Sequence, residues 1–231
     1  MSIEGLRRTR APRGSGDRLR DEILGAATDL LLETGHARSV SIRSVAQRVG
    51  VTPPSIYLHF TDKDALMDAV CARYFEKLDL EMQRVATEYT SPVEVLRAQG
   101  LAYIRFATEN PELYRIATMG EWRSGSNIDM TLDSSAFRHM RGTVQKLMED
   151  GIYPPDDPTT VALELWSAAH GVAAMLIAKP HLPFGDAEAF ADRVLCSVFY
   201  GRVVFGYFGP NLTPEKLAAW VTTPRQSEPR I

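Results

Sequence analysis

The stretch VTPPSIYLHF brings together side chains whose chemistry suits contact with nucleic acid. Tyr57 and His59 can donate hydrogen bonds to phosphate oxygens, and Lys63 follows with an ammonium group that can pair with one. Pro53 and Pro54 present a compact apolar surface that can approach a DNA groove closely and touch thymine methyl groups. The spacing therefore predicts a short element that meets DNA, although two adjacent prolines also occur in ordinary turns.

A second set of candidate chemical groups lies much further along the chain. Trp166 and His170 are four residues apart, so they share one face of a helix and can stack or bind a common neighbour. The same spacing fits a buried aromatic residue packed on a core histidine. His170 and His139 are also the candidate acid or base groups of an all-α enzyme. Because no nucleophile, carboxylate pair, phosphate loop or metal-ligand spacing accompanies either, we expect no enzyme, no cofactor and no metal site.

The elements that would position the first set are two short helices and a turn within SIRSVAQRVGVTPPSIYLHF, the layout of a helix-turn-helix. Ser41 can cap the first helix, and Gly50 suits its left-handed end because a residue without Cβ adopts a positive φ at little cost. Thr52 suits the cap of the second helix, whose first residue is Pro53 or Pro54, since proline is tolerated at a helix start. The apolar residues expected to form the shared core are Ile42, Val45, Val49, Val51, Ile56 and Phe60.

Apolar residues recur at helical spacing along the rest of the chain, and no convincing alternating strand is found, so the sequence predicts an all-α fold. Asp17 is expected to cap the first helix, which ends before Gly35. Later helices are expected from residue 62, from 92 to 110, on both sides of the loop GEWRSGSNID, and at 131–150, 158–179, 187–208 and 214–220.

Charge is distributed unevenly along the sequence. Residues 1–65 contain ten Arg or Lys and eight Asp or Glu, a balance of +2, whereas the remainder contains sixteen against twenty-one, a balance of -5. A basic arm on an otherwise acidic protein suggests a local anionic partner; the alternative is a solvated disordered tail. Arg43, on the first helix of the helix-turn-helix, can reach a DNA backbone from the other side.

The sequence also indicates a compartment. The N-terminal stretch MSIEGLRRTRAPRGSGDR lacks the apolar region of a secretory signal, and LWSAAHGVAAMLIA falls short of the roughly 18 apolar residues of a membrane span. Cys71 and Cys196 lie far apart and match no disulfide framework, which fits a reducing environment. We therefore expect a soluble cytoplasmic protein without a membrane segment.

Three stretches, LRDEILGAATDLLLETG, SIRSVAQRVGVTPPSIYLHF and TDKDALMDAV, together resemble the TetR family of bacterial transcriptional regulators. The resemblance implies a disordered basic arm at 1–16, a DNA-binding domain at 17–65 and an effector-binding and dimerisation domain at 66–231. It implies base contacts from Thr52, Pro53, Pro54, Ser55 and Leu58, and DNA-backbone contacts from Ser41, Arg43, Tyr57, His59 and Lys63. Leu58 differs from the polar or aromatic residue that is common at its position.

In the larger C-terminal part, ENPELYRIATMG and WSAAHG are similar to segments of family members, the second to the Trp-x-x-x-His-Gly pattern of one subgroup. Large adaptable side chains could line a mostly apolar pocket for a small apolar or amphipathic effector, or form a plain core: Tyr103, Phe106, Met119, Trp122, Phe137, Met140, Trp166, His170 and Met175.

The helices at about 158–179 and 187–208 have wide apolar faces. We expect them to pair with the same helices of a second copy, helped by the small residues Ala168, Ala169, Gly171, Ala173 and Gly201. The resemblance thus implies a homodimeric bacterial repressor of a near-palindromic double-stranded DNA operator, released when a small-molecule effector binds.

Overall fold

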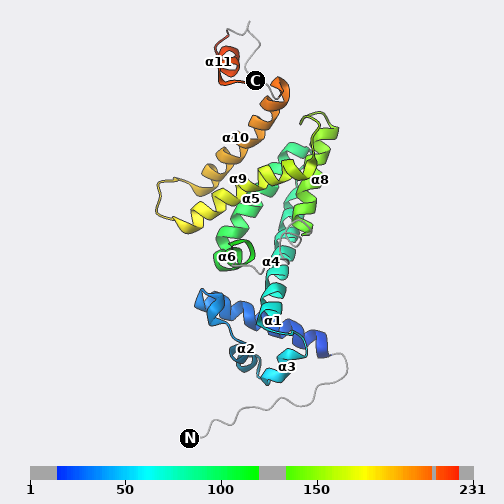
Figure 1. The fold of residues 1–231 in the computed structure, drawn as a ribbon, viewed down its shortest axis with the longest axis vertical. Coiled ribbons are helices and arrows are strands. Elements are labelled where there is room, and N and C mark those ends of the chain that lie inside the picture. The colour runs from blue at the N-terminus through cyan, green and yellow to red at the C-terminus, as the bar shows by residue number, and fades with distance from the viewer. Residues whose placement is uncertain (1–14, 120–133, 210–211, 224–231) are drawn as a thin grey trace.

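The computed structural model describes residues 15–119, 134–209 and 212–223, and every regular element in these ranges is a helix (Figure 1). The predicted all-α fold is confirmed. The elements are α1 (Ser15–Thr34), the 3-10 turn η1 (Ala37–Ser39), α2 (Ile42–Val49), α3 (Pro53–Tyr57), α4 (Lys63–Ala86), α5 (Pro92–Glu109), α6 (Pro111–Met119), α8 (Ser135–Glu149), α9 (Pro158–Ala178), α10 (Ala187–Phe208) and α11 (Pro214–Thr222). Most of the predicted basic arm and the loop GEWRSGSNID lie outside the described residues.

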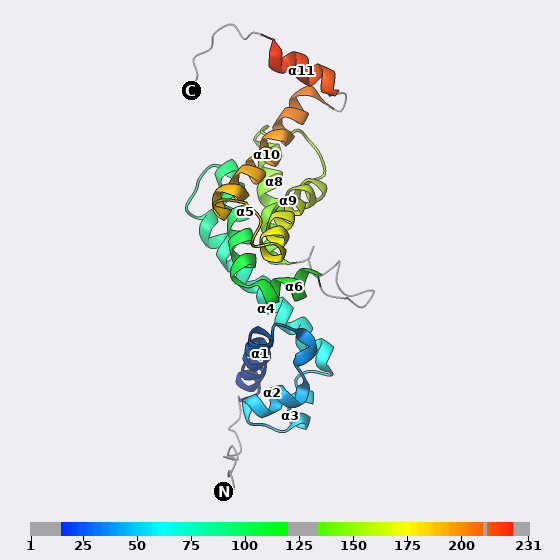
Figure 2. The same ribbon diagram turned by 90° about the vertical axis from the view of Figure 1, so that its left-hand side faces the viewer.

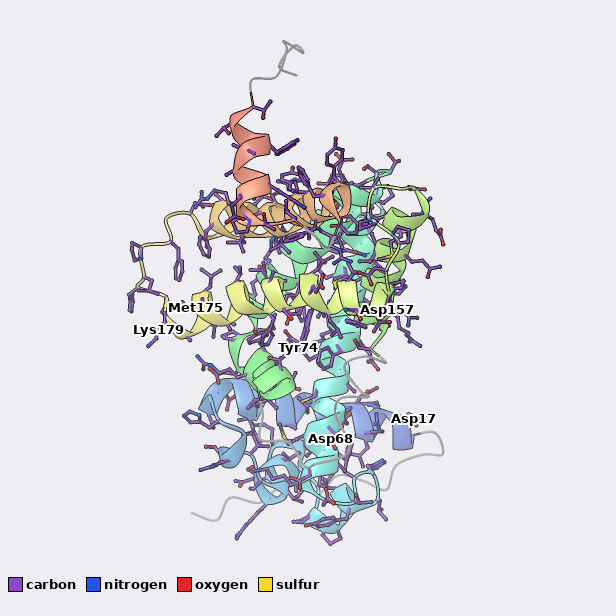
Figure 3. The ribbon with its side chains drawn as sticks, turned by 45° about the horizontal axis from the view of Figure 1, so that its top comes forward. Asp17, Asp68, Tyr74, Asp157, Met175 and Lys179 are labelled. Carbon is purple, nitrogen blue, oxygen red and sulfur yellow. The ribbon has the colours of Figure 1, made fainter. Side chains whose placement is uncertain are left out.

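The molecule has a small N-terminal body made by α1, α2 and α3, and a larger bundle that contains α5, α8, α9 and α10 (Figures 1 and 2). Helix α4 runs from one body into the other: it packs on α1 near its start and on α5 and α8 further along. Asp68 lies on its lower part and Tyr74 closer to the bundle (Figure 3). The predicted domain limit at residue 65 falls in the first turn of α4, so one continuous helix crosses it.

The first helix begins earlier than predicted. Helix α1 starts at Ser15, so Asp17 lies in its first turn and does not cap it. A carboxylate there still faces the positive end of the helix dipole, which explains why the sequence signal pointed to a helix start. Ser15 and Gly16, assigned to the disordered arm, are helical. The helix ends before Gly35, as predicted, and Gly35 has a φ of +69°.

Helix α9 corrects the expectation about membrane-spanning length. With 21 residues it is the one helix among the described residues that is long and apolar enough to cross a membrane by length and composition alone. It packs against α5, α8 and α10 and leaves one stripe exposed, and the Asp157 carboxylate caps its first turn by accepting from the amides of Thr159 and Thr160. A single such helix is equally typical of a bundle core, and its packing favours that role.

The last helices reach beyond the bundle. Helix α10 continues past the other helices and leads to α11, which buries none of its residues (Figures 1 and 2). Exposed aromatic side chains, among them Tyr200, Phe205 and Tyr207, lie on this part of α10. The chain therefore leaves apolar surface uncovered at its C-terminal end.

Candidate functional site

Helix α2 is held at both ends by the residues that the sequence singled out. Ser41 Oγ accepts from the Ser44 amide at 3.0 Å, and the Ser41 amide donates to Ser44 Oγ at 2.9 Å, which together make a capping box. Gly50 ends the helix with a φ of 76°. Val45 is fully buried, and Ile42 packs against the same core. The Ser41 hydroxyl is thus engaged within its own helix, so a contact of this helix end with phosphate falls to the free amides of its first turn.

Helix α3 begins at Pro53, which answers the question left open between the two prolines. Thr52 takes the cap position in extended geometry, but its side chain makes no capping hydrogen bond. The reason is that Pro53 and Pro54 have no amide hydrogen, while the Ser55 amide already donates to the Thr52 carbonyl at 2.9 Å. Thr52 Oγ1 lies 3.1 Å from Ser55 Oγ instead.

The outer face of α3 carries unusually exposed side chains. Leu58 is 84% exposed and Tyr57 is 53% exposed, whereas Ile56 and Phe60 between and beside them are buried. Thr52 and both prolines are exposed as well, and Ser55 and His59 are half-buried. The two buried residues therefore anchor a helix whose other residues meet solvent.

The positively charged side chains around α3 differ in whether they already have hydrogen-bond or ion-pair partners within the chain. Lys63 Nζ donates to the Ala37 carbonyl of η1 at 2.7 Å, which leaves two of its three N–H groups for another partner. Arg43 is exposed and has no hydrogen-bond or ion-pair partner in the described chain. Arg48 holds Glu33 through two bonds of 2.8 and 2.6 Å, which lower the pKa of that carboxyl. Arg38 on η1 is an exposed cation that the sequence argument missed.

A second candidate site is an apolar cavity of about 30 Å³ lined by helices of the larger bundle. Helices α4, α5, α8, α9 and α10 all contribute to its wall. Four of the side chains expected to line a pocket do so, namely Tyr103, Phe137, Met140 and Trp166. The wall also includes Phe75, Leu78, Met82, Leu96, Gln99, Leu165, Leu195 and Phe199, which the sequence argument did not assign to it.

The other predicted pocket residues are not among its wall. Phe106 packs on Tyr74, with 5.1 Å between ring centroids, and faces the junction of α4 with α1. Met175 is 45% exposed and lies near Lys179, at the opposite end of α9 from Asp157 (Figure 3). The side chains of Met119 and Trp122 are outside the described residues. Spacing along one helix could not show which of these residues face a common centre, because that depends on how five helices are rotated against each other.

His170 lies next to the cavity in a cluster of aromatic hydrogen-bonding groups. Its Nδ1 atom is 2.9 Å from the Tyr114 hydroxyl and 3.2 Å from the Tyr103 hydroxyl, and its ring is 5.1 Å from that of Trp166. Burial lowers the pKa of His170, so the imidazole is neutral at pH 7. This geometry is that of a hydrogen-bonded core histidine on a neighbouring aromatic residue.

His139 also has a defined partner. Its Nδ1 atom lies 2.7 Å from Asp79 Oδ1, and the amide of Gln83 donates to the other oxygen of that carboxylate at 2.8 Å. In the described part of the chain, no serine or cysteine side chain bonds to the ring of His139 or His170, and no group of three potential metal ligands occurs. The contact between His139 and Asp79 joins α8 to α4. Neither histidine is paired with a nucleophile that it could activate among the described residues.

Gln99 is the most informative residue that the sequence argument missed. It lines the cavity with 2% of its surface exposed, and one end of its side-chain amide meets Thr143 Oγ1 at 3.2 Å. The other end has no hydrogen-bond partner in the described residues. The signal was present in the sequence, because Gln99 falls on the same helix face as Leu96 and Tyr103, where a polar residue is unusual.

Two family models match this chain. Residues 23–70 match the model of the bacterial regulatory proteins of the tetR family, and residues 96–198 match a tetracyclin repressor-like C-terminal domain. The first covers the helix-turn-helix and the start of α4. The second covers most of the helices that enclose the cavity.

Individual relatives agree with these matches. The chain is 30% identical over 97 residues to the nucleoid occlusion factor SlmA of Vibrio vulnificus strain YJ016, a match that covers 42% of this chain and 50% of that protein. The chain thus spans about half the length of the curated relatives it matches.

Two solved structures share the fold. One, of unknown function from Rhodococcus sp. RHA1, has a TM-score of 0.71 and 23% identity over 85% of this chain and 100% of the other. SmeT, the repressor of the Stenotrophomonas maltophilia efflux pump SmeDEF, has a TM-score of 0.59 and 24% identity over 84% and 95%.

Proposed function

Because the chain belongs to the TetR family of bacterial regulatory proteins, we propose that it is a homodimeric repressor that leaves a near-palindromic DNA operator when a small-molecule effector binds. Members of this family are soluble DNA-binding regulators, and the family is not one of enzymes. We propose a cytoplasmic location for this member. The repressor role is supported by the shared fold of SmeT, which is itself described as a repressor.

The observation that carries the DNA-binding role is the exposed outer face of α3. Leu58 and Tyr57 are exposed to solvent, whereas Ile56 and Phe60 are buried and anchor the helix. Exposed apolar side chains are unfavourable in water, so a partner surface that covers Leu58 and Tyr57 would gain binding free energy. In this proposal Thr52, Pro53, Pro54, Ser55 and Leu58 meet base edges. Arg43, Tyr57, His59 and Lys63 hold the DNA backbone, and Ser41 takes part by capping the helix turn whose free amides face a phosphate.

Dimerisation through α9 and α10 is supported by surface that each helix leaves uncovered. On α9 the exposed positions follow helical steps at Ser167, Gly171 and Met175, and on α10 at Ser197 and Tyr200. Several residues first expected at this interface, such as Ala169 and Ala173, are buried within the chain's own core instead. The proposed contact therefore uses the stripe that remains outside that core. Two recognition helices of such a dimer would enter major grooves about 34 to 36 Å apart, or at a variant of that spacing.

Effector release is supported by the path of α4. This helix begins beside the helix-turn-helix, where Lys63 bonds to η1, and further along it supplies Phe75, Leu78 and Met82 to the cavity wall. A ligand that widens the cavity would push on the helix that carries the DNA-binding body. The ligand would release DNA only if it binds more tightly to the conformation with α4 displaced than to the conformation that binds DNA. The difference between these two affinities limits the size of its effect.

The test is DNA binding by Tyr57→Ala in a gel shift against the DNA upstream of the chain's own gene and against random duplexes. If the Tyr57 hydroxyl holds phosphate, affinity should fall by about 10-fold to 100-fold on every sequence alike, consistent with the loss of one hydrogen bond to a charged group. Replacing Pro53 or Pro54 by Ala should instead change the preference among sequences.

Tyr89→Ala is the matched control, since Tyr89 is another exposed tyrosine but follows the end of α4 in the larger body. It should bind DNA as the unchanged protein does. Unaltered affinity of Tyr57→Ala at physiological salt would show that α3 does not dock on DNA in this way.

A further inference from the structure

Among the described residues, the cavity wall carries no ionised side chain. Its residues are aliphatic, aromatic, methionine, glycine, serine or glutamine, with neither Lys, Arg, Asp, Glu nor His among them. The nearest carboxylate on α4, Asp79, has both oxygens engaged by His139 and Gln83. A charged ligand group would lose its hydration here and gain no opposite charge from the described wall in return, which opposes its binding in a low-dielectric interior.

Most polar groups of the wall already have partners. The Tyr103 hydroxyl meets His170 Nδ1 at 3.2 Å and the Trp166 indole, and Ser134 Oγ accepts from the Phe137 amide at 3.2 Å. Gln99 differs, because one end of its amide meets Thr143 and the other end has no partner in the described chain. The Gln99 Oε1 atom accepts from Thr143, so the Nε2 donor is the end that a ligand oxygen can bind, and such a hydrogen bond would add affinity.

We propose that this cavity takes an uncharged, mostly apolar ligand, with a ring or short chain and one carbonyl or hydroxyl oxygen that hydrogen bonds to the side-chain amide of Gln99. This rests on the proposed role of the cavity as the effector site. It narrows the effector to neutral molecules and excludes carboxylates and phosphates of the same size.

The size of the cavity defines how such a ligand enters. About 30 Å³ accommodates little more than a water molecule or two, whereas pockets for small ligands measure several hundred Å³. Met82 on α4 and Met140 on α8 line the wall, and methionine side chains adapt to irregular shapes at low cost. A ligand larger than the present cavity therefore requires these side chains to rearrange.

The experiment compares three probes of similar size at pH 7.5: acetophenone, ethylbenzene and benzoate. Ligand-detected NMR titrations of the full chain give a dissociation constant for each. Acetophenone should bind about 2-fold to 10-fold more tightly than ethylbenzene, the value of one neutral hydrogen bond, and benzoate should show no saturable binding. In Gln99→Met, which keeps the length of the side chain, acetophenone and ethylbenzene should bind equally well. Gln145→Met, at an exposed glutamine of α8, should behave as the unchanged protein does.

A second measurement does not depend on any variant. In the complex with the unchanged protein, the carbonyl stretch of acetophenone should move to lower wavenumber, as it does on accepting a hydrogen bond. Three outcomes would overturn the proposal. Benzoate could bind as tightly as acetophenone, acetophenone and ethylbenzene could bind with equal affinity, or none of the three could show saturable binding. A further result would separate this proposal from the proposed effector release. If acetophenone binds more tightly than ethylbenzene but does not change the affinity for DNA, effector release is contradicted and the proposed ligand class is still supported.

Discussion

His170 is a polar side chain of the core with defined hydrogen-bond partners, and it shows what such burial implies for stability. Its Nδ1 atom faces two tyrosine hydroxyls, and its burial lowers its pKa relative to the unfolded chain. The unfolded chain therefore takes up a proton near pH 6.5, before the folded chain does. Because stability rises with pH wherever the unfolded state binds more protons, His170 contributes stability that is complete above about pH 6.5 and is lost as pH falls below it.

We accordingly expect the free energy of unfolding in urea to decrease between pH 7.5 and pH 5.5, and to decrease less in His170→Gln. Glutamine keeps a hydrogen-bonding group near Tyr114 but does not titrate. The control is His181→Gln, at an exposed histidine between α9 and α10. It should keep the full pH dependence of the unchanged protein. Equal pH dependence in all three proteins would contradict the assignment.

The identities of these residues were visible in the sequence, but their partners were not. Trp166 and His170 were predicted to share a helix face, and their rings lie 5.1 Å apart. Tyr114 on α6 was not connected with them, because it is 56 residues away from His170. Local spacing predicts neighbours within one helix, whereas a contact between helices depends on packing.

At the scale of elements, the helix boundaries follow local capping chemistry, and Gly50 is the clearest case. Its φ of 76° ends α2, and an added Cβ would meet no other atom there, so the cost of a side chain is conformational. Gly50→Ala should lower the free energy of unfolding by about 1 kcal/mol.

The matched control is Gly25→Ala inside α1, where the added methyl also meets nothing. There alanine is the better helix former, so stability should rise by up to about 1 kcal/mol. Thermal and urea unfolding of the two variants check both signs. A Gly50→Ala protein as stable as the unchanged one would show that the left-handed turn is not maintained in solution.

Elements whose ends are set by residues next to them were predicted well. Helix α10 has the predicted limits of 187 and 208, with the Asp186 carboxylate as its cap. One expectation about a helix start failed. Asp17 looks like a cap from sequence alone, but the helix continues to Ser15. Thr52 occupies the predicted cap position of α3, but its side chain makes no capping hydrogen bond, because Pro53 and Pro54 lack amide hydrogens and the Ser55 amide donates to the Thr52 carbonyl.

At the scale of the whole molecule, the proposed dimer depends on two helices whose outer faces are uncovered in the single chain. Gly171 on α9 is exposed, and an added Cβ there meets no atom of its own chain. If α9 packs against a second copy, Gly171→Arg should be tolerated by the fold and should block association. Size exclusion with light scattering should give twice 25.7 kDa for the unchanged protein and about 25.7 kDa for the variant.

Gly142→Arg supplies the control, because Gly142 is also an exposed helical glycine without neighbours but lies on α8. It should remain dimeric. If the unchanged protein has a monomeric mass at micromolar concentration, the dimer proposal and the half-site geometry built on it both fail. If Gly171→Arg stays dimeric, the interface lies elsewhere on the surface.

The sequence by itself determined the all-helical fold, the helix-turn-helix and the family, since caps, turns and apolar periodicity are local properties of neighbouring residues. Only the tertiary structure decided that Phe106 and Met175 stay away from the cavity and that Gln99 lines it. These outcomes depend on the rotation and distance of helices that are far apart in sequence. Many small packing contacts between helices set both quantities, and no short stretch of sequence specifies them.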